Sequence, residues 1–501
     1  MLRKLIASVA GLGLLAAALG LFLHARAGGA RRPDVVMIAI DTLRADHVGC
    51  LGNDWIATPH IDALAADGVL FTRCFATAPW TLPSFASIFT GLLPSRHGAV
   101  GGAHEVLDDR FRTLAECLSD AGYRTYGFAS VKWLTPPFGT CQGFNFERPV
   151  TAPEGLDGAP LVTALGTATF DLPRDKPLFT FLHYFDVHAP YAPPPPFARR
   201  YYAGDERAPG RPVLDFLLST ANAAPNRNSG MYDWLAGVTD LDFPAREYAA
   251  AVTYEDDHVG RVIAKLKAAG RYDDALIVLV ADHGEHLGEH DIWFTHALPY
   301  QETLHVPLLI KLPRGEGAGR VVDTPVSTLD LMPTLLGRLG LPAPAGDGRS
   351  LRALLAGEAD DGASLLAAEH GSEPNDLGLA LIEWPWKTIH ARTPDGTRRE
   401  LYNLELDPGE ECDLQARCPR QLASMSGRVE EAFEEWRGGG PVQLAKPAAV
   451  DAATRRHLRS LGYVVGRGKA AADAEDDVAE GTAPASSSST WPAEERPARV
   501  Q

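Results

Sequence analysis

The stretch that decides the fold is VVMIAID, residues 35–41, an uninterrupted apolar run that ends on Asp41. A second stretch of the same kind, LIVLVADHGE, occupies residues 276–285. Similar apolar runs occur at 125–130, 178–185 and 306–310, with helical stretches between them. Continuous apolar runs are typical of strands that are buried on both faces of a sheet. We therefore expect an α/β fold with a mostly parallel central sheet and helices on both of its faces.

The helical stretches and a second unit follow from the spacing of apolar residues. Helical spacing covers residues 61–70, 107–118, 248–266 and 330–336. From about residue 376 the pattern changes to short strand-like pieces, which predict a small antiparallel sheet followed by a helix at about 419–437. Four units are predicted. They are a membrane anchor or signal segment with its spacer (1–32), the large α/β domain (33–375), a C-terminal α+β subdomain (376–467) and a disordered tail (468–501).

The charge balance excludes one class of partner. The chain of 501 residues carries 64 acidic and 47 basic side chains, a net charge of −17. A broad basic face, the footprint of a nucleic-acid-binding protein, is therefore not expected, and neither is a nucleic-acid partner. An anionic substrate stays open, because a metal ion and a few local cations are enough to hold one.

The N-terminal segment predicts export. Arg3 and Lys4 precede an apolar run at 5–23, which is nearly the length of about 20 residues that crosses a bilayer core. The tripeptide at 25–27, Ala-Arg-Ala, also fits a signal-peptide cleavage site. An uncleaved membrane anchor and a cleaved signal, which would leave a periplasmic or secreted protein, both remain open. The six cysteines permit disulfides, for example between Cys412 and Cys418, but buried free thiols fit equally well.

Chemistry-bearing side chains follow the two best-defined strands. Asp41 comes directly after the first apolar run, and Asp282 and His283 come directly after the second. Ligands of open α/β sheets bind beyond the carboxyl ends of the strands, so these side chains converge if the two strands are neighbours. Thr81 lies in a turn just before a predicted helix, near the positive end of the helix dipole.

Together these residues form a candidate centre for one divalent metal ion with a bound alcohol. Its predicted ligands are Asp41, Thr81, Asp282 and His283. Metal coordination is one way to turn a hydroxyl into a nucleophile at neutral pH. Oxygen ligands with one imidazole suit Ca²⁺, Mn²⁺, Mg²⁺ or Zn²⁺. Taken singly, each residue also has a structural reading, such as a helix N-cap for Thr81 or Asp41.

The chain resembles the sulfatase family of the alkaline phosphatase superfamily over roughly residues 34–464. The ordered segments that carry the resemblance include VVMIAIDTLRADHVGCLG (35–52), PWTLPSFASIFTGLLPSRHG (79–98), LHYFDVHAPY (182–191), ADHGEHLGEH (281–290), LDLMPTLL (329–336) and LYNLELDPGEECDL (401–414). The resemblance implies an alkaline-phosphatase-like α/β domain and a smaller C-terminal domain with a short antiparallel sheet. Export is common among such bacterial proteins.

The resemblance also implies residue roles. Asp41, Asp282 and His283 would be metal ligands, with Thr81 as nucleophile and fourth ligand. His188 and His296 match positions that contact the substrate oxyanion. Further substrate-binding candidates are Arg96 and His97, although their Ser-Arg-His-Gly turn also fits a purely structural role. A second metal held by Asp186, His188 and His296 is an open alternative with weak spacing.

Two departures from the family pattern bear on the chemistry. Formylglycine sulfatases carry Cys or Ser in a Cys/Ser-x-Pro-x-Arg motif, whereas this chain has Thr81 and Phe85 at the first and last positions. Oxidation of Thr at Cβ would give a ketone, so no formylglycine is expected. Thr42 also replaces a second acidic or polar ligand. With these changes the chain looks like the Thr-using phosphodiesterases and phosphoglycerol or phosphoethanolamine transferases of the superfamily.

The sequence thus predicts a metal-dependent hydrolase of sulfate or phosphate esters and diesters, with Thr81 as nucleophile. Its substrate would be an anionic ester, and phosphate is favoured over sulfate. One alternative is a transferase that moves a phosphoryl head group onto an envelope acceptor. Another is a non-catalytic sulfatase-like binding protein. Specificity is expected to lie in the Tyr-, Pro- and Arg-rich insertion at 190–247.

Overall fold

The computed structural model describes most of the chain from residue 31 onward. The described residues are 31–100, 106–145, 158–220, 230–296, 298–359, 365–370, 378–393, 396–436, 448–449 and 454. The apolar segment at 5–23 and the tail from 468 lie outside these ranges. Within the described ranges, no helix combines the length and apolar character that a bilayer crossing needs.

A mixed, mostly parallel sheet forms the centre of the larger unit. Its strand order is β10-β2-β8-β5-β1-β4-β3, with β9 paired to β2. β8 runs antiparallel to both of its neighbours, and the other pairs are parallel. The strands are β1 Val35–Ile40, β2 Val69–Phe75, β3 Arg124–Ala129, β4 Leu178–Tyr184, β5 Leu276–Ala281, β8 His305–Lys311, β9 Arg320–Val322 and β10 Val326–Ser327. Every residue of β1, β4 and β5 is buried, as expected for strands covered on both faces.

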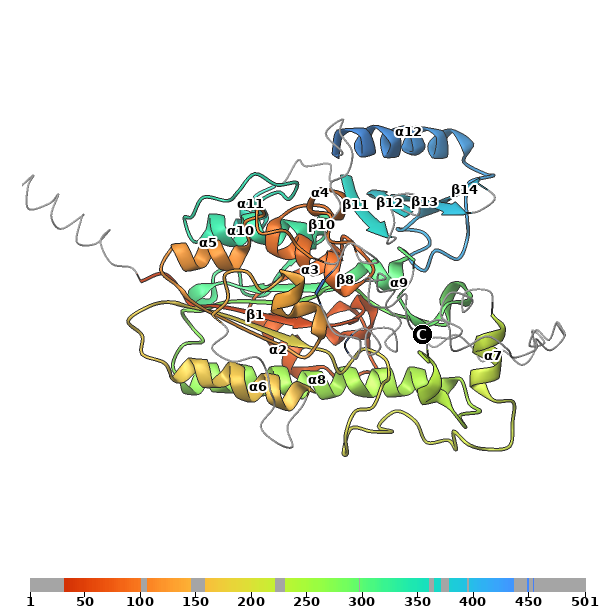
Figure 1. Cartoon of the computed structure of the whole chain (residues 1–501), viewed down its shortest axis with the longest axis horizontal. Helices are drawn as coiled ribbons and strands as arrows, with labels where there is room; N and C mark the ends of the chain where they lie inside the picture. Colours follow the sequence, from red (N-terminus) through yellow and green to blue (C-terminus); the bar gives the residue numbers. More distant parts are fainter. Residues whose placement is uncertain are drawn as a thin grey trace, which may run out of the picture.

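Helices cover the two faces of this sheet (Figure 1). On one face lie α6 and the long α8, which pack against each other, and α2 packs against α8. On the other face lie α3, α5 and α10 (Figure 1). The helix bounds are α2 Pro59–Ala66, α3 Thr81–Thr90, α4 Pro94–His97, α5 Leu114–Asp120, α6 Gly158–Ala168, α7 Val213–Ser219, α8 Asp242–Ala268, α9 Gln301–Leu304, α10 Leu331–Arg338 and α11 Arg352–Ala356.

The C-terminal part forms a smaller antiparallel sheet, β11-β12-β13-β14, with α12 packed on it. Its elements are β11 Leu365–His370, β12 Gly378–Glu383, β13 Trp386–Thr393, β14 Gly396–Asn403 and α12 Pro419–Trp436. This unit stands beside the larger sheet near α9 (Figure 1). The predicted fold class is therefore confirmed in both of its parts.

The sequence patterns missed some elements. Helical spacing at 61–70 merges two elements, because α2 ends at Ala66 and β2 begins at Val69. The helix expected at 107–118 begins later, at Leu114, where Thr113 forms a capping box with Glu116. All six cysteines are free thiols, so the loop that Cys412 and Cys418 could have closed is not closed by a disulfide.

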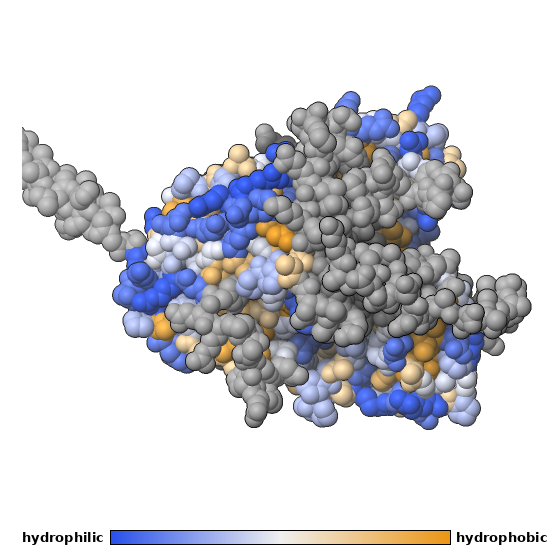
Figure 2. Space-filling view, viewed as in Figure 1, coloured by the Kyte–Doolittle hydropathy of each residue, from blue (hydrophilic) through white to orange (hydrophobic). Residues whose placement is uncertain are grey.

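The described residues visible in Figure 2 form a mixed surface, in which hydrophilic residues predominate and apolar residues lie singly or in small groups. Large apolar side chains of the described residues are mostly buried, and the well-exposed ones are Val321 and Leu406. Scattered exposed apolar residues are ordinary for a soluble domain surface. Function is therefore better sought in the buried polar residues at the end of the central strands.

Candidate active site

The carboxyl ends of β1, β4 and β5 meet at one edge of the sheet. In the registers of these strands, Ile40 of β1 pairs with Ala281 of β5 on one side and with Tyr184 of β4 on the other. Asp41 and Asp282 therefore follow neighbouring strands at the same level. The amide of Asp41 continues the pairing by donating to the carbonyl of Tyr184 at 2.8 Å. The expectation that the two strands are neighbours is confirmed.

A histidine that the sequence analysis did not single out joins the two aspartates. His183 lies in β4 opposite Ala39 of β1, and side chains two residues apart on a strand share a face, so His183 points to the same side as Asp41. Its Nε2 atom is 3.2 Å from Oδ2 of Asp41. Ligand atoms of Asp41, His183 and Asp282 all lie within 4.8 Å of one another, and all three residues are buried. The sequence feature that could have identified His183 is a histidine within an otherwise apolar strand.

Thr81 faces this group from the first position of α3. The N-cap of α3 is Trp80, so Thr81 is not itself the cap residue, and it is fully buried. Its Oγ1 atom is 3.4 Å from Oδ2 of Asp41 and 3.4 Å from Nε2 of His283. Ser84, one turn later, donates its hydroxyl to the carbonyl of Asp282 at 2.7 Å, which ties the helix start to the end of β5. The Thr81 hydroxyl is thus positioned both by the start of α3 and by the end of β5.

His283 completes what we call the Thr81 cluster, which consists of Asp41, Thr81, His183, Asp282 and His283. The Nδ1 atom of His283 lies 2.9 Å from the carbonyl oxygen of Gly284. A carbonyl only accepts, so Nδ1 carries the hydrogen and Nε2 presents a lone pair to the cluster. That Nε2 is 3.5 Å from Oδ2 of Asp282 and 3.7 Å from Oδ1 of Asp41. An imidazole fixed in this way through its other nitrogen is typical of a metal ligand.

The residues of the Thr81 cluster fit a divalent cation. Oδ1 of Asp41, Oδ2 of Asp282 and both ring nitrogens of His183 are buried without a hydrogen-bond partner. Burial raises the pKa of Asp41 well above its usual range, and burial together with the charge of Asp41 does the same for Asp282. Two such carboxylates ionise together only beside a compensating cation. Burial also lowers the pKa values of His183 to about 4 and of His283 to about 3, which keeps both rings neutral and able to bind a metal.

His188 and His296 form a pair next to the cluster. Their Nε2 atoms lie 3.2 Å apart, and the ring of His296 also contacts the ring of His283, with 4.4 Å between centroids. The Nδ1 atom of His188 faces the carbonyl of Ala189 at 2.6 Å, and that of His296 faces the carbonyl of Pro79 at 2.9 Å. Both Nδ1 atoms therefore carry hydrogens, and the two Nε2 atoms face each other. The two facing Nε2 lone pairs are accommodated by a shared proton or by a substrate atom bound between the rings.

The second metal set that the sequence left open is not formed. Oδ2 of Asp186 accepts a hydrogen bond from the amide of Ala159 at 3.0 Å, and Asp186 also interacts with the buried Glu255 of α8. Among the described residues, the groups of three or more donors close enough to hold a metal do not include Asp186. Asp186 is therefore left out of the candidate site.

Arg96 and His97 are placed elsewhere in the fold. The Arg96 side chain is 43% exposed, and its guanidinium pairs with Asp347 at 3.1 Å. His97 accepts from the amide of Ala99 through Nδ1 and contacts Ser87 Oγ through Nε2, each at 3.1 Å. The contacts described for these two residues thus link α3, α4 and the loop of Asp347 rather than reaching the Thr81 cluster. They support the structural reading of the turn.

Thr42 holds an unusual backbone conformation directly after Asp41. Its φ is 55°, which a β-branched residue rarely adopts and which costs about 1–3 kcal/mol. The carbonyl of Thr42 accepts from the hydroxyl of Tyr248 at 2.7 Å, and the same hydroxyl accepts from the amide of Arg44 at 3.1 Å. A contact from α8 therefore fixes the turn that directs the chain away from β1 after Asp41.

The chain is similar in sequence and fold to known proteins. A family model described as Sulfatase matches residues 33–341, and one described as N-sulphoglucosamine sulphohydrolase, C-terminal, matches residues 288–434. An arylsulfatase of Clostridium perfringens (strain 13 / Type A) is 27% identical over 387 residues, covering 65% of this chain and 78% of that protein. The multifunctional alkaline phosphatase superfamily protein PehA of Trinickia caryophylli is 29% identical over 405 residues, covering 65% and 77%. The crystal structure of the phosphonate monoester hydrolase of Agrobacterium radiobacter is 25% identical, with a TM-score of 0.64, and the match covers 81% of this chain and 96% of that one.

Proposed function

The chain belongs to the sulfatase family, and we propose that within this family it is a hydrolase of phosphate esters or diesters that uses Thr81 as its nucleophile. That it is a sulfatase-like ester hydrolase follows from its relatives, which include named sulfatases and a phosphonate monoester hydrolase. The single observation that carries the finer proposal is the position of Thr81 Oγ1, 3.4 Å from both Asp41 Oδ2 and His283 Nε2.

Members of the family generally depend on a divalent metal, and the Thr81 cluster supplies donors for one. Asp41, His183, Asp282 and His283 would hold the ion, and Thr81 would be its substrate-facing neighbour. When bound, a divalent cation withdraws charge from the Thr81 oxygen and favours its deprotonation at neutral pH. Carboxylate and imidazole donors together suit Mn²⁺ or Zn²⁺ better than Mg²⁺ or Ca²⁺.

The reaction would proceed in two balanced steps. The Thr81 oxygen attacks phosphorus, the bond from phosphorus to the leaving oxygen breaks, and overall the Thr81 proton leaves with the alcohol. Water then attacks the phosphothreonine, the bond from phosphorus to the Thr81 oxygen breaks, and the hydroxyl is restored. His188 and His296, with Nε2 atoms directed at one place, would hold a proton against a phosphoryl oxygen and stabilise charge in both steps.

The preference for phosphorus rests on Thr81 and Phe85. A formylglycine hydrate has a second hydroxyl that expels sulfate, but a Thr ester has none, so water must attack the central atom directly. Phe85 is fully buried, and its ring lies against Phe181 and His183, with centroid distances of 5.6 and 5.1 Å. An apolar ring thus occupies the position where the formylglycine motif has its arginine.

A panel assay tests this proposal. The purified chain is offered aryl sulfate, phosphate monoester, phosphodiester and phosphonate substrates, with Mn²⁺, Zn²⁺, Mg²⁺ or Ca²⁺ added in turn. We expect phosphate mono- or diester turnover to exceed aryl sulfate turnover. Sulfate turnover well above all phosphorus substrates would overturn the preference. Turnover only after an acceptor alcohol is added would favour the transferase. We propose water as the acceptor, because water needs no further binding site.

We also propose that the protein acts outside the cytoplasm. The support is the apolar run at 5–23 with Arg3 and Lys4 before it and the small-residue tripeptide after it. Cell fractionation followed by N-terminal sequencing of the mature protein tests this. An intact N-terminus in the membrane fraction indicates an anchor, a new N-terminus near residue 28 indicates cleavage, and a cytoplasmic protein contradicts both.

A further inference from the structure

A second group of metal-seeking side chains lies where the larger unit meets the C-terminal sheet. Ligand atoms of His290, Glu302 and Glu410 are all within 4.8 Å of one another. His290 follows β6 (His286–Leu287), Glu302 lies on α9, and Glu410 belongs to the segment after β14. Three parts of the chain thus bring donors to one place, although His290 and Glu410 are more than a hundred positions apart in the sequence.

The polar atoms of this group are poorly satisfied by the protein itself. Nε2 of His290 and Oε2 of Glu302 are buried without a hydrogen-bond partner, and these two atoms are 3.6 Å apart. Glu302 and Glu410 are 6% and 1% exposed. Glu410 has Lys387 Nζ 2.8 Å from its Oε1 and the amide of Gln301 on its Oε2, so its charge is balanced. Glu302 has His290 at 3.6 Å and the charges of His286 and Arg44 nearby, but among the described residues no Lys or Arg forms a direct ion pair with it.

A fully buried histidine next to the group gives an independent indication. His286 is 0% exposed, and neither of its ring nitrogens has a hydrogen-bond partner. Its ring centroid is 6.3 Å from that of His290, and the charges of Glu302 and Glu289 act on it. A buried imidazole with both nitrogens unsatisfied is rare in a folded protein unless it binds something. His290 itself is held in place by stacking on Tyr300, with centroids 3.8 Å apart.

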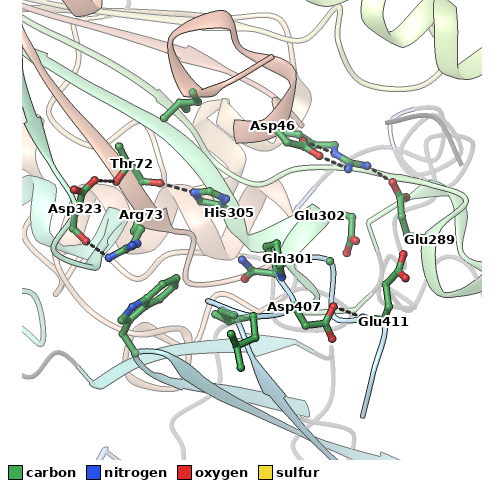
Figure 3. A pocket seen from close by; sticks show the side chains of 17 residues that line it. Asp46, Thr72, Arg73, Glu289, Gln301, Glu302, His305, Asp323, Asp407 and Glu411 are labelled. Carbon is green, nitrogen blue, oxygen red and sulfur yellow. Dashed lines mark hydrogen bonds and ion pairs between the residues drawn. The ribbon is translucent and has the colours of Figure 1, made fainter. Parts of the chain in front are cut away.

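An acidic pocket borders the group at Glu302. The pocket has a volume of about 790 Å³ and lies between the larger unit and the C-terminal segment, with Glu302 on its wall (Figure 3). Six carboxylates line it against two guanidinium groups, which are those of Arg44 and Arg73. Arg44 binds the carboxylates of Asp46 and Glu289, and Arg73 binds the backbone carbonyl of Asp323. Figure 3 shows no bonded partner of Glu302 among the residues drawn. Such a pocket concentrates cations at its wall.

We propose that His290, Glu302 and Glu410, with His286 beside them, form a second divalent-metal site that joins the 286–304 segment to the C-terminal unit. A mixture of imidazole and carboxylate donors selects Zn²⁺ or Mn²⁺ over Mg²⁺ and Ca²⁺. A carboxylate oxygen has more than one lone pair, so Glu410 can keep Lys387 and still serve as a ligand. The amide of Gly284 donates to the carbonyl of Thr303 at 2.8 Å, so this site also supports the segment that carries Asp282 and His283.

Metal content of matched variants tests the proposal. The full chain is stripped with a chelator, dialysed against Zn²⁺ or Mn²⁺, and its metal per chain is measured by plasma mass spectrometry. Asp282→Asn removes a ligand of the Thr81 cluster only. Glu302→Gln keeps the shape of the side chain, and His290→Phe keeps the stacking on Tyr300. We expect two equivalents in the wild type and one in each of these variants, with unchanged circular dichroism.

The double variant Asp282→Asn/Glu302→Gln decides between a metal and an ion pair of protonated His290 with Glu302. We expect Asp282→Asn to keep one equivalent of metal and to melt at a lower temperature after chelation. When Glu302→Gln is added to it, we expect that equivalent to be lost. No metal in the Asp282→Asn variant, or equal metal content in the wild type and Glu302→Gln, would overturn the proposal. If His290→Phe does not fold, the Glu302→Gln comparison decides alone. These outcomes do not depend on whether Thr81 is a nucleophile.

Discussion

The Nε2 atoms of His188 and His296 lie 3.2 Å apart, while the Nδ1 atom of each ring faces a backbone carbonyl oxygen. Two neutral rings held in this way direct two lone pairs at each other, and a shared proton or a bound oxygen with a hydrogen removes the conflict. Burial lowers both pKa values, with the charge of His296 adding to the effect at His188 and that of His283 at His296, so the rings share a proton only beside an anion such as the substrate. The pair is therefore suited to oxyanion contact.

Replacing either ring removes this contact without removing the metal donors. We expect His188→Gln and His296→Gln each to lower kcat/KM about 10²- to 10³-fold, as for removal of one oxyanion donor. Metal content should stay at the wild-type level. His390→Gln is the matched control, since His390 is a buried histidine of the C-terminal sheet, and its activity should be close to that of the wild type. Wild-type kcat/KM in both active-site variants would remove the pair from the mechanism.

His183 should act on metal affinity rather than on the chemical step. Its Nε2 atom contacts Asp41, and the ring has no other described hydrogen bond. We expect His183→Ala to weaken metal binding by at least the 10- to 100-fold typical for loss of a supporting partner, with activity partly rescued by excess metal. Isothermal titration of the stripped chain measures the affinity. Tyr184→Phe, one residue along β4, is the control and should bind metal normally; equal affinities in all three chains would show that His183 is not a ligand.

Phe85 should matter for stability. Its fully buried ring packs between α3 and β4, and we expect Phe85→Ala to lower the free energy of unfolding by about 3–5 kcal/mol. Phe85→Arg should cost at least as much, because the rings in contact with it, those of Phe89, Phe181 and His183, offer no carboxylate to pair with a buried guanidinium. Denaturant unfolding measures both values. A Phe85→Arg variant as stable as the wild type would show that this pocket still accommodates an arginine.

The stability of the chain should depend on pH through His97. Burial lowers the pKa of His97 to about 3, whereas the unfolded chain binds the proton near pH 6.5. Its contribution is therefore present above pH 6.5 and is lost as the pH falls toward 3. We expect the wild type to lose about 2 kcal/mol more than His97→Gln between pH 7.5 and pH 5. Urea unfolding at both values checks this, and parallel curves for the two chains would contradict it.

The sequence predicted the fold class and the strand ends well because buried parallel strands have a pattern of their own. Asp41, Asp282 and His283 could be placed together since ligands of such sheets gather at the carboxyl ends of the strands. His183 was missed because a single histidine inside an apolar strand does not reveal which face it occupies until the register is known. β2 was missed because its first residues continue the helical spacing of α2.

Contacts between distant segments could not be predicted from local patterns. His290, Glu302 and Glu410 meet only because the C-terminal unit packs beside α9, and no spacing in the sequence encodes that packing. Arg96 and His97 are the opposite case. Their motif suggested substrate binding, but the partners that the fold supplies, Asp347 and Ser87, satisfy them away from the Thr81 cluster.

Thr81 is the centre of the account, and its covalent intermediate can be observed directly. The chain is mixed with the best phosphate ester of the panel, quenched in acid during turnover, digested and analysed by mass spectrometry. We predict a phosphoryl adduct on Thr81, and a loss of activity of about 10³-fold or more in Thr81→Ala. Thr90→Ala, a buried threonine of the same helix, should stay active. Full activity of Thr81→Ala, with no adduct on Thr81 of the wild type, would contradict the assignment of Thr81 as the nucleophile.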